Sequence, residues 1–207
     1  MEQNPESKVY IDLRRKILEG NLKDGDRLAE IPLAKKYEVS RLHVKSALQM
    51  LEKEQLAKHV PRCGFVVCGV NESVIDEIIL IRDAMEGIVI KRVCEVATEK
   101  NIEEIKRIVS RISVFVHNDM MTDAFEELQH FYAYLYDLSG YKRVVTILKN
   151  YSDYIDIVKR MTTTKEENLH ALEIVESLAA AIEEYDINRA IEMIKQRSSL
   201  NAKKSKK

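Results

Sequence analysis

The sequence predicts a mainly α protein: a small N-terminal domain of short helices and one β-hairpin, followed by an all-α antiparallel helical bundle. Two short amphipathic helical patterns precede an alternating stretch that contains Pro61 and Gly64, which is typical of a hairpin. All 3 prolines lie before residue 62, so the remaining chain is poor in helix breakers. The 207 residues suffice for two domains, which we expect at residues 1–70 and 71–207.

The first helix is predicted over Val9–Leu18, where four apolar residues form one stripe: Val9, Leu13, Ile17 and Leu18. Residues 19–28 contain two glycines and two aspartates, which favour a turn. Pro32 suits the first turn of a short second helix that ends near Tyr37.

A third helix is predicted from Arg41 to about Glu54, after a short connection at residues 38–39. Ser40 precedes this helix, and its side chain can accept hydrogen bonds from the first turn. Four apolar residues lie on one face at core-packing spacing: Val44, Ala47, Leu48 and Leu51. The following residues 57–68 alternate, and we expect two strands joined at residues 61–64, where Gly64 permits a positive φ.

This order of helix, short turn, helix and basic hairpin predicts a winged helix-turn-helix domain, whose second helix enters the major groove of DNA. Arginine and lysine at its N-terminus can donate to guanine O6 and N7, and the helix N-terminus suits a phosphate oxygen. The candidate DNA-binding residues are Ser40, Arg41, His43, Lys45, Arg62 and Gly64.

Charge and cysteine content limit the class of protein. The net charge is −1, but residues 1–70 hold 13 Lys+Arg against 10 Asp+Glu, whereas the remainder holds 20 against 24. That asymmetry permits DNA binding without demonstrating it. Three irregularly spaced cysteines favour a reducing cytoplasm over a disulfide framework, and no apolar run is long enough to span a membrane.

The remaining chain shows a series of six helical patterns joined by short connections, as in a helical bundle. Possible helix starts are Asn71 or Ser73, Asn101 with Glu104 as a capping box, Thr163 with Glu166, and Asp186. The first expected helix runs to about Ala97, and Asn101 opens the second. Four further helices are expected at Asp123–Leu138, closed by Ser139–Gly140, and at Tyr141–Met161, Lys165–Glu184 and Ile187–Ala202. The last six residues, AKKSKK, are expected to form a frayed basic tail.

The stretch VSRLHVKSALQMLEKEQLAKHVPRCGFVV (residues 39–67) resembles the GntR family of bacterial transcription regulators. The resemblance covers about residues 8–70 and implies a winged helix-turn-helix that binds double-stranded DNA. Eight positions fall directly on the family pattern: Ser40, Arg41, Ala47, Leu48, Leu51, Leu56, Arg62 and Gly64.

Four residues depart from that pattern. Lys45 stands where the family usually has a base-contacting arginine, His43 replaces a proline, and Gln55 replaces a glycine after the helix. Ile31 stands where many members carry another basic residue. Lysine is a point charge rather than a bidentate fork, so we expect the operator to differ from the family's usual one.

Residues 72–200 resemble the ligand-binding and dimerisation domain of the fatty-acid-regulator (FadR/FCD-like) subfamily. Three segments carry this resemblance: IRDAMEGIVIKRVCE, FYAYLYDLSGYKRV and AAAIEEYDINRAIEMIKQR. Many members hold a metal with one Asp and three His, but the matching positions here are Leu128, Tyr132, Val175 and Arg197. The resemblance therefore implies no metal at that site. His130 and His170 are alternative ligands, or packed or surface histidines.

A small anionic effector could instead be bound by Tyr132, Arg197 and Arg82, because arginine suits carboxylate or phosphate. The alternative is that Arg197 is exposed or pairs with a neighbouring acid. We therefore expect a cytoplasmic bacterial regulator that binds a pseudo-palindromic operator as a homodimer and represses transcription. Its effector would change the placement of the DNA-binding domains across residues 67–72.

Three other classes of function remain as alternatives. In the first, the DNA-binding dimer has a purely structural C-terminal domain and no effector. A helical enzyme is disfavoured, because the sequence has no Gly-rich phosphate loop, nucleophile elbow or paired His–carboxylate set. A helical adaptor using the winged module for protein contacts is the third, and salt-dependent, sequence-specific DNA binding would exclude it.

Overall fold

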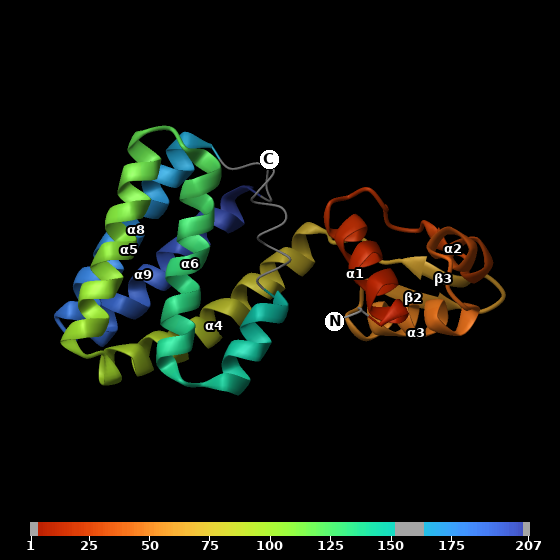
Figure 1. Cartoon of the computed structure of the whole chain (residues 1–207), viewed down its shortest axis with the longest axis horizontal. Helices are drawn as coiled ribbons and strands as arrows, with labels where there is room; N and C mark the ends of the chain where they lie inside the picture. Colours follow the sequence, from red (N-terminus) through yellow and green to blue (C-terminus); the bar gives the residue numbers. More distant parts are fainter. Residues whose placement is uncertain (1–3, 152–163, 205–207) are drawn as a thin grey trace. The chain divides into compact units, whose positions relative to one another are not determined.

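A computed structural model describes residues 4–151 and 164–204 of the chain (Figure 1). The chain divides into two compact units, Met1–Asn71 and Glu72–Lys207. The first combines helices with a small sheet and the second is a helical bundle, so the predicted fold class is confirmed. Within the described ranges, no helix has both the length and the apolar character that crossing a bilayer requires.

Helix α1 spans Pro5–Leu18 and packs against α3. The predicted stripe of this helix is buried: Val9, Leu13, Ile17 and Leu18. The helix begins four residues before the expected start because Pro5 occupies its first turn, where the absent N–H of proline costs nothing. That first turn is polar, so apolar periodicity could not detect it.

Helices α2 (Glu30–Tyr37) and α3 (Arg41–Lys53) form the predicted pair. The turn between them requires Glu38 to adopt a left-handed conformation, with φ +56°. Ser40 caps α3 as predicted, because its Oγ accepts a hydrogen bond from the His43 backbone N–H at 3.2 Å. The apolar stripe of α3 is fully buried: Val44, Ala47, Leu48 and Leu51.

The sheet has three antiparallel strands in the order β1-β3-β2. Strands β2 (Ala57–Val60) and β3 (Gly64–Val67) are the predicted hairpin. Strand β1 (Arg27–Leu28) was not predicted, because two residues carry no measurable alternation and the surrounding glycines and aspartates favour a turn. Its formation depends on pairing with β3, where Leu28 lies opposite Phe65.

Helix α3 ends in a Schellman motif centred on Gln55. The backbone N–H groups of Gln55 and Leu56 donate to the carbonyl oxygens of Glu52 and Leu51 at 3.0 and 2.9 Å. This arrangement holds Gln55 in the left-handed region, with φ +62°. A side chain at such a position costs about 1–2 kcal/mol, which glycine avoids.

Replacing Gln55 with glycine is therefore expected to stabilise the first unit by about 1 kcal/mol, because the left-handed conformation is then unstrained. The measurement is the free energy of urea unfolding of the full chain, followed by circular dichroism. Gln55→Ala is the control, since it shortens the side chain but keeps the Cβ that causes the strain. Equal unfolding free energies for the glycine and alanine variants would contradict this explanation.

The second unit contains α4 (Glu72–Val96), α5 (Glu99–His117), α6 (Met121–Ser139), α8 (Lys165–Glu183) and α9 (Ile187–Lys204). Residues 142–151 are also helical, and the rest of the expected Tyr141–Met161 helix lies outside the described residues. Helix α4 packs on α9 and α6, while α5 packs on α6 and α8 (Figure 1). Aliphatic side chains from these helices form one continuous core.

The helix starts of this unit correct two of the predictions. Helix α5 is capped by Thr98, which forms a capping box with Asn101, so Asn101 is the third helical residue and not the cap. Helix α8 is capped by Thr164 with Glu167, one residue later than the predicted pair. Each stretch offers a second polar residue with suitable spacing, and the packing of the apolar face selects the register. Asp186 caps α9 as predicted, accepting from the Arg189 N–H at 3.0 Å.

Candidate nucleic-acid interface and interior polar cluster

The exposed face of α3 carries two cations one turn apart. Arg41 and Lys45 are both exposed, on the side of the helix away from the buried stripe. Arg41 Nη2 lies 3.5 Å from Glu30 Oε2, which brings it close to the first turn of α2. An exposed ion pair of this kind is weak, at about 0–1 kcal/mol, so Arg41 can leave Glu30 for a nucleic-acid acceptor.

Ser40 and His43 lie at the N-terminus of the same helix. The capping bond uses the Ser40 hydroxyl oxygen as an acceptor, which leaves its O–H as a donor at the positive end of the helix dipole. His43 is half-buried, and its Nδ1 atom has no hydrogen-bond partner among the described residues. His43 therefore contributes less accessible surface to this face than Arg41 and Lys45 do.

The turn between β2 and β3 presents Arg62 to solvent. The Cys63 backbone N–H donates to the Val60 carbonyl oxygen at 3.1 Å, which closes a β-turn with Pro61 and Arg62 at its centre. Arg62 itself has a positive φ of +64°, and Gly64 follows with φ +88°. The positive φ predicted for Gly64 is present, and Arg62 adopts a second one although the left-handed region favours glycine or asparagine.

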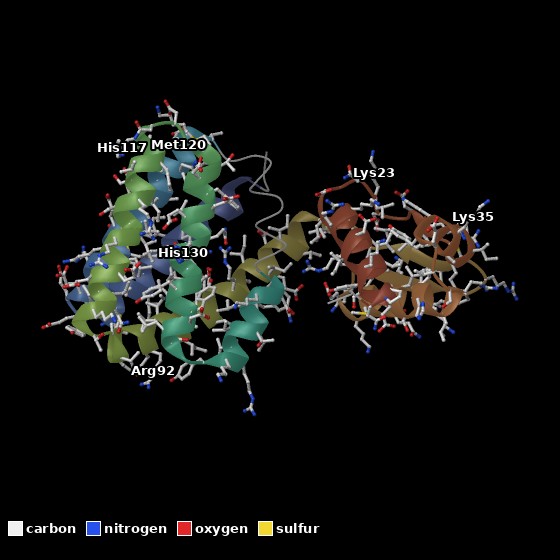
Figure 2. All side chains as sticks on the ribbon, viewed as in Figure 1. Lys23, Lys35, Arg92, His117, Met120 and His130 are labelled. Atoms are coloured by element: carbon white, nitrogen blue, oxygen red, sulfur yellow. The ribbon has the colours of Figure 1, made fainter. Side chains whose placement is uncertain are left out.

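Two exposed lysines outside the predicted set of DNA-binding residues add positive charge to this unit. Lys35 and Lys36 lie in the last turn of α2, and Figure 2 shows Lys35 extending from the edge of the domain. Their position at the end of the first helix of the pair is the signal that could have identified them. Backbone phosphates attract such lysines without sequence preference.

A polar cluster around Asp12 fixes α1 to α2. Tyr37 donates its phenolic O–H to Asp12 Oδ2 at 2.5 Å, and Lys16 and Arg15 also donate to this carboxylate. Burial by itself raises the pKa of Asp12, but the hydrogen bonds from Lys16, Tyr37 and Arg15 outweigh it and hold the pKa well below its usual range. The carboxylate therefore stays charged and keeps its hydrogen bond from Tyr37, which joins α2 to α1.

The second unit contains charged groups in its interior. Arg82 and Glu86, one turn apart on α4, are 1% and 0% exposed. The Glu86 carboxylate accepts a short hydrogen bond from the Tyr136 hydroxyl, and its Oε1 lies 3.1 Å from Arg197 Nη1 on α9. Its other oxygen, Oε2, lies 3.9 Å from Arg82 Nε. The predicted effector residues Arg82 and Arg197 thus converge on one buried carboxylate.

Tyr132, the third predicted effector residue, lies against the same cluster. Arg197 Cζ is 3.7 Å from the centroid of the Tyr132 ring, a cation–π distance. Burial raises the pKa of Tyr132 despite the opposing charge of Arg197. Burial, together with Glu86, raises the pKa of Tyr136 well above its usual range. Both phenols are therefore neutral, and that of Tyr136 donates its O–H to Glu86.

We name Arg82, Glu86, Tyr132, Tyr136 and Arg197 the interior polar cluster. Burial and the charge of Arg197 lower the pKa of Arg82, while Glu86 opposes this effect. Glu86 and Tyr136 are not among the residues predicted from the sequence. Each follows a selected residue, Arg82 or Tyr132, by four positions on a helix, and that spacing could have identified both.

The side chains at the family's metal positions do not fit a metal ion. Leu128 and Val175 are buried aliphatic residues without donor atoms. The raised pKa of Tyr132 keeps its phenol protonated, and Arg197 is a cation. Within residues 4–151 and 164–204, no group of three or more His, Cys, Asp or Glu side chains could hold a metal.

The two alternative histidine ligands both lie at the surface. His130, labelled on α6 in Figure 2, has Nδ1 3.2 Å from Glu127 Oε1. His170 on α8 has Nδ1 3.1 Å from Glu173 Oε2. Each histidine lies beside a carboxylate on its own helix, which is a surface side-chain pair and not a multidentate metal site.

Comparison with protein families gives two matches along the chain. Residues 5–67 match the gntR family of bacterial regulatory proteins, and residues 77–197 match the FCD domain. The chain is 28% identical over 156 residues to an uncharacterised HTH-type transcriptional regulator, YdhC, of Bacillus subtilis, covering 75% of this chain and 70% of that protein. It is 30% identical over 109 residues to the gluconate operon transcriptional repressor of the same organism, covering 53% and 44%, respectively.

Solved structures share the fold over nearly the whole chain. McbR/YncC of Escherichia coli has a TM-score of 0.69 and 19% identity, with 99% of this chain and 98% of that chain covered. A transcriptional regulator GntR from Rhodococcus sp. RHA1 has a TM-score of 0.65 and 18% identity, with 97% and 96% covered. At these identities, the likeness supports the fold alone.

Proposed function

Because the chain belongs to the GntR family of bacterial regulatory proteins and has an FCD domain as its second unit, we propose that it represses transcription from an operator in response to a small anionic metabolite. It is a DNA-binding transcriptional regulator and not an enzyme. Repression is the activity named for the gluconate operon repressor, with which it shares 30% identity over 109 residues. We propose the cytoplasm as its site of action, where it meets bacterial DNA.

The observation that carries operator recognition is the exposed pair Arg41 and Lys45 on a helix whose opposite face is buried. We assign base readout to Arg41 and Lys45, phosphate contacts to Ser40, and backbone or groove contacts to Arg62 on the wing. His43 and Gly64 complete the assigned site, Gly64 by permitting the turn that exposes Arg62. A homodimer would place one α3 in each half of a pseudo-palindromic operator.

Selection of duplexes from a random DNA pool by the full chain tests this function. We expect one enriched sequence with two-fold symmetry, and an affinity that falls steeply with salt because lysines and arginines displace counterions from phosphates. Binding without enrichment of any sequence, or no binding to DNA at low salt, would refute operator recognition.

We assign effector binding to the interior polar cluster. Two guanidiniums, those of Arg82 and Arg197, lie in this cluster, and a guanidinium has the planar donor geometry that binds a carboxylate or phosphate. Such a ligand could alter operator affinity only by binding the DNA-competent and DNA-incompetent states unequally. The pairing of Arg197 with Glu86 supports the second candidate, in which the bundle is purely structural.

Thermal unfolding against a panel of small carboxylates and phosphates distinguishes these two candidates. For an effector at 100 times its Kd, we expect the Tm to rise by about 5–10 °C, corresponding to about 2.7 kcal/mol. Arg197→Ala should lose this rise, because it removes a cation of the cluster. Arg189→Ala is the control, since Arg189 lies on the same helix and forms an exposed ion pair with Glu184.

For each variant, the Tm with ligand is compared with the Tm of the same variant without ligand. A loss of basal stability in a variant therefore does not affect the result. If ligand raised the Tm of Arg197→Ala as much as that of the parent, the effector would bind outside the cluster. No response of the parent to any member of the panel would favour the structural bundle.

A further inference from the structure

The first turns of α2 and α3 each expose a large apolar side chain. Ile31 is 65% exposed and Leu42 is 71% exposed, compared with 49% for Ile11 on α1. Ile31 follows Glu30 and Leu42 follows Arg41, the two residues that form the ion pair between these turns. Neither side chain contributes to the buried core of the first unit. Core packing therefore gives no reason for apolar residues at these two positions.

We propose that Ile31 and Leu42 read thymine bases in the major groove through the C5-methyl group. The proposal rests on the proposed operator binding and adds a base preference to it. Thymine alone presents a methyl group in the major groove, and apolar side chains recognise it by contact. Leu42 belongs to the same first turn as Arg41, and the Glu30–Arg41 pair brings the Ile31 turn close to that turn.

Charge favours DNA over a protein as the surface that covers these side chains. Arg41 and Lys45 flank Leu42 along α3, and all three are exposed. A second copy of the chain packed symmetrically on this surface would bring Arg41 and Lys45 close to their own equivalents, at an electrostatic cost. A polyanion neutralises the same charges while the apolar side chains contact its bases.

Deoxyuridine substitution isolates the methyl contact, because it removes the C5-methyl group and leaves base pairing intact. The probe is the duplex selected by the full chain, with each thymine replaced in turn by deoxyuridine. Burial of one methyl-sized group is worth about 0.8 kcal/mol, so we expect binding to weaken about fourfold at each thymine that is read.

Single variants then assign each contact to a side chain. In Leu42→Ala and in Ile31→Ala, deoxyuridine should no longer weaken binding at one thymine position, the one that the replaced side chain contacts. At the other position, deoxyuridine should still weaken binding as it does for the parent. Ile11→Ala is the matched control, since it removes an exposed apolar side chain from α1 and should keep the full discrimination at both positions. All three positions are exposed, so the variants should keep the parent circular dichroism spectrum.

Several outcomes would overturn the proposal without affecting operator binding itself. One is an enriched operator in which every deoxyuridine duplex binds as tightly as the parent. Another is full discrimination in both Ile31→Ala and Leu42→Ala. A third is a loss of self-association in these variants with unchanged discrimination, which would assign the surface to a protein contact. Failure to enrich any sequence, by contrast, refutes the proposed function from which this inference starts.

Discussion

Replacing Arg41 and Lys45 together with alanine is expected to abolish sequence-specific DNA binding and leave the fold intact. Each side chain lost from a base edge costs about 1–3 kcal/mol, so the pair should weaken specific binding at least about 30-fold. The fold should persist because both residues are exposed and Arg41 makes only a 3.5 Å ion pair with Glu30. Alanine is also the best helix former, which favours a retained α3.

The measurement is titration of the selected operator and of a scrambled duplex with the parent and the double variant. Lys100→Ala with Arg107→Ala is the charge-matched control, since these exposed residues on α5 remove the same net charge from the other unit. The control should keep both the operator affinity and the ratio to the scrambled duplex. Retained operator preference in the Arg41 and Lys45 variant would show that α3 is not the reading helix.

Glu86→Ala is expected to destabilise the second unit by about 3–5 kcal/mol, because it removes one partner of an ion pair in the protein interior. Glu86 is fully buried, accepts from Tyr136 and lies 3.1 Å from Arg197. Removal also leaves the Tyr136 hydroxyl, held neutral by its raised pKa, without its acceptor. An unsatisfied buried hydroxyl adds a further desolvation cost of about 1–3 kcal/mol at most.

Urea unfolding followed by circular dichroism measures this loss, with Glu95→Ala as the control. Glu95 lies on the same helix and pairs with Arg92 at 3.2 Å, but this pair is exposed, so its removal should cost less than about 1 kcal/mol. Glu86→Gln tests the contribution of charge, since it keeps an oxygen acceptor for Tyr136. A Glu86→Ala variant within about 1 kcal/mol of the parent would mean that the guanidiniums are neutralised by other groups.

Much of the DNA-binding unit could be predicted from local sequence. The apolar stripe of α3, the Ser40 cap and the two strands of the wing each depend on residues within a few positions of one another. Periodicity and capping are local effects, so they are readable without the fold. The same reasoning failed at β1, whose two residues become a strand only by pairing with β3, distant in the sequence.

The interior polar cluster shows the opposite case. The resemblance points to Tyr132 and Arg197, and Arg82 is predicted as a further donor, but no pattern in the sequence points to Glu86, the carboxylate near both arginines. An acidic residue in an amphipathic helix is usually solvent-exposed, and only the packing of α4 against α6 and α9 buries this one. A buried carboxylate is stable only with partners, and those partners come from three helices far apart in the chain.

The sequence by itself determined the helix-turn-helix, its capping serine and the cations on the exposed face of α3, because each follows from periodicity and spacing within one or two turns. Tertiary structure alone decided which polar residues are buried together and which apolar residues remain outside the core. Glu86 became the centre of a charged cluster, while Ile31 and Leu42 remained exposed beside Arg41. Burial depends on which distant segments pack over a residue, and the local pattern of a chain does not contain that information.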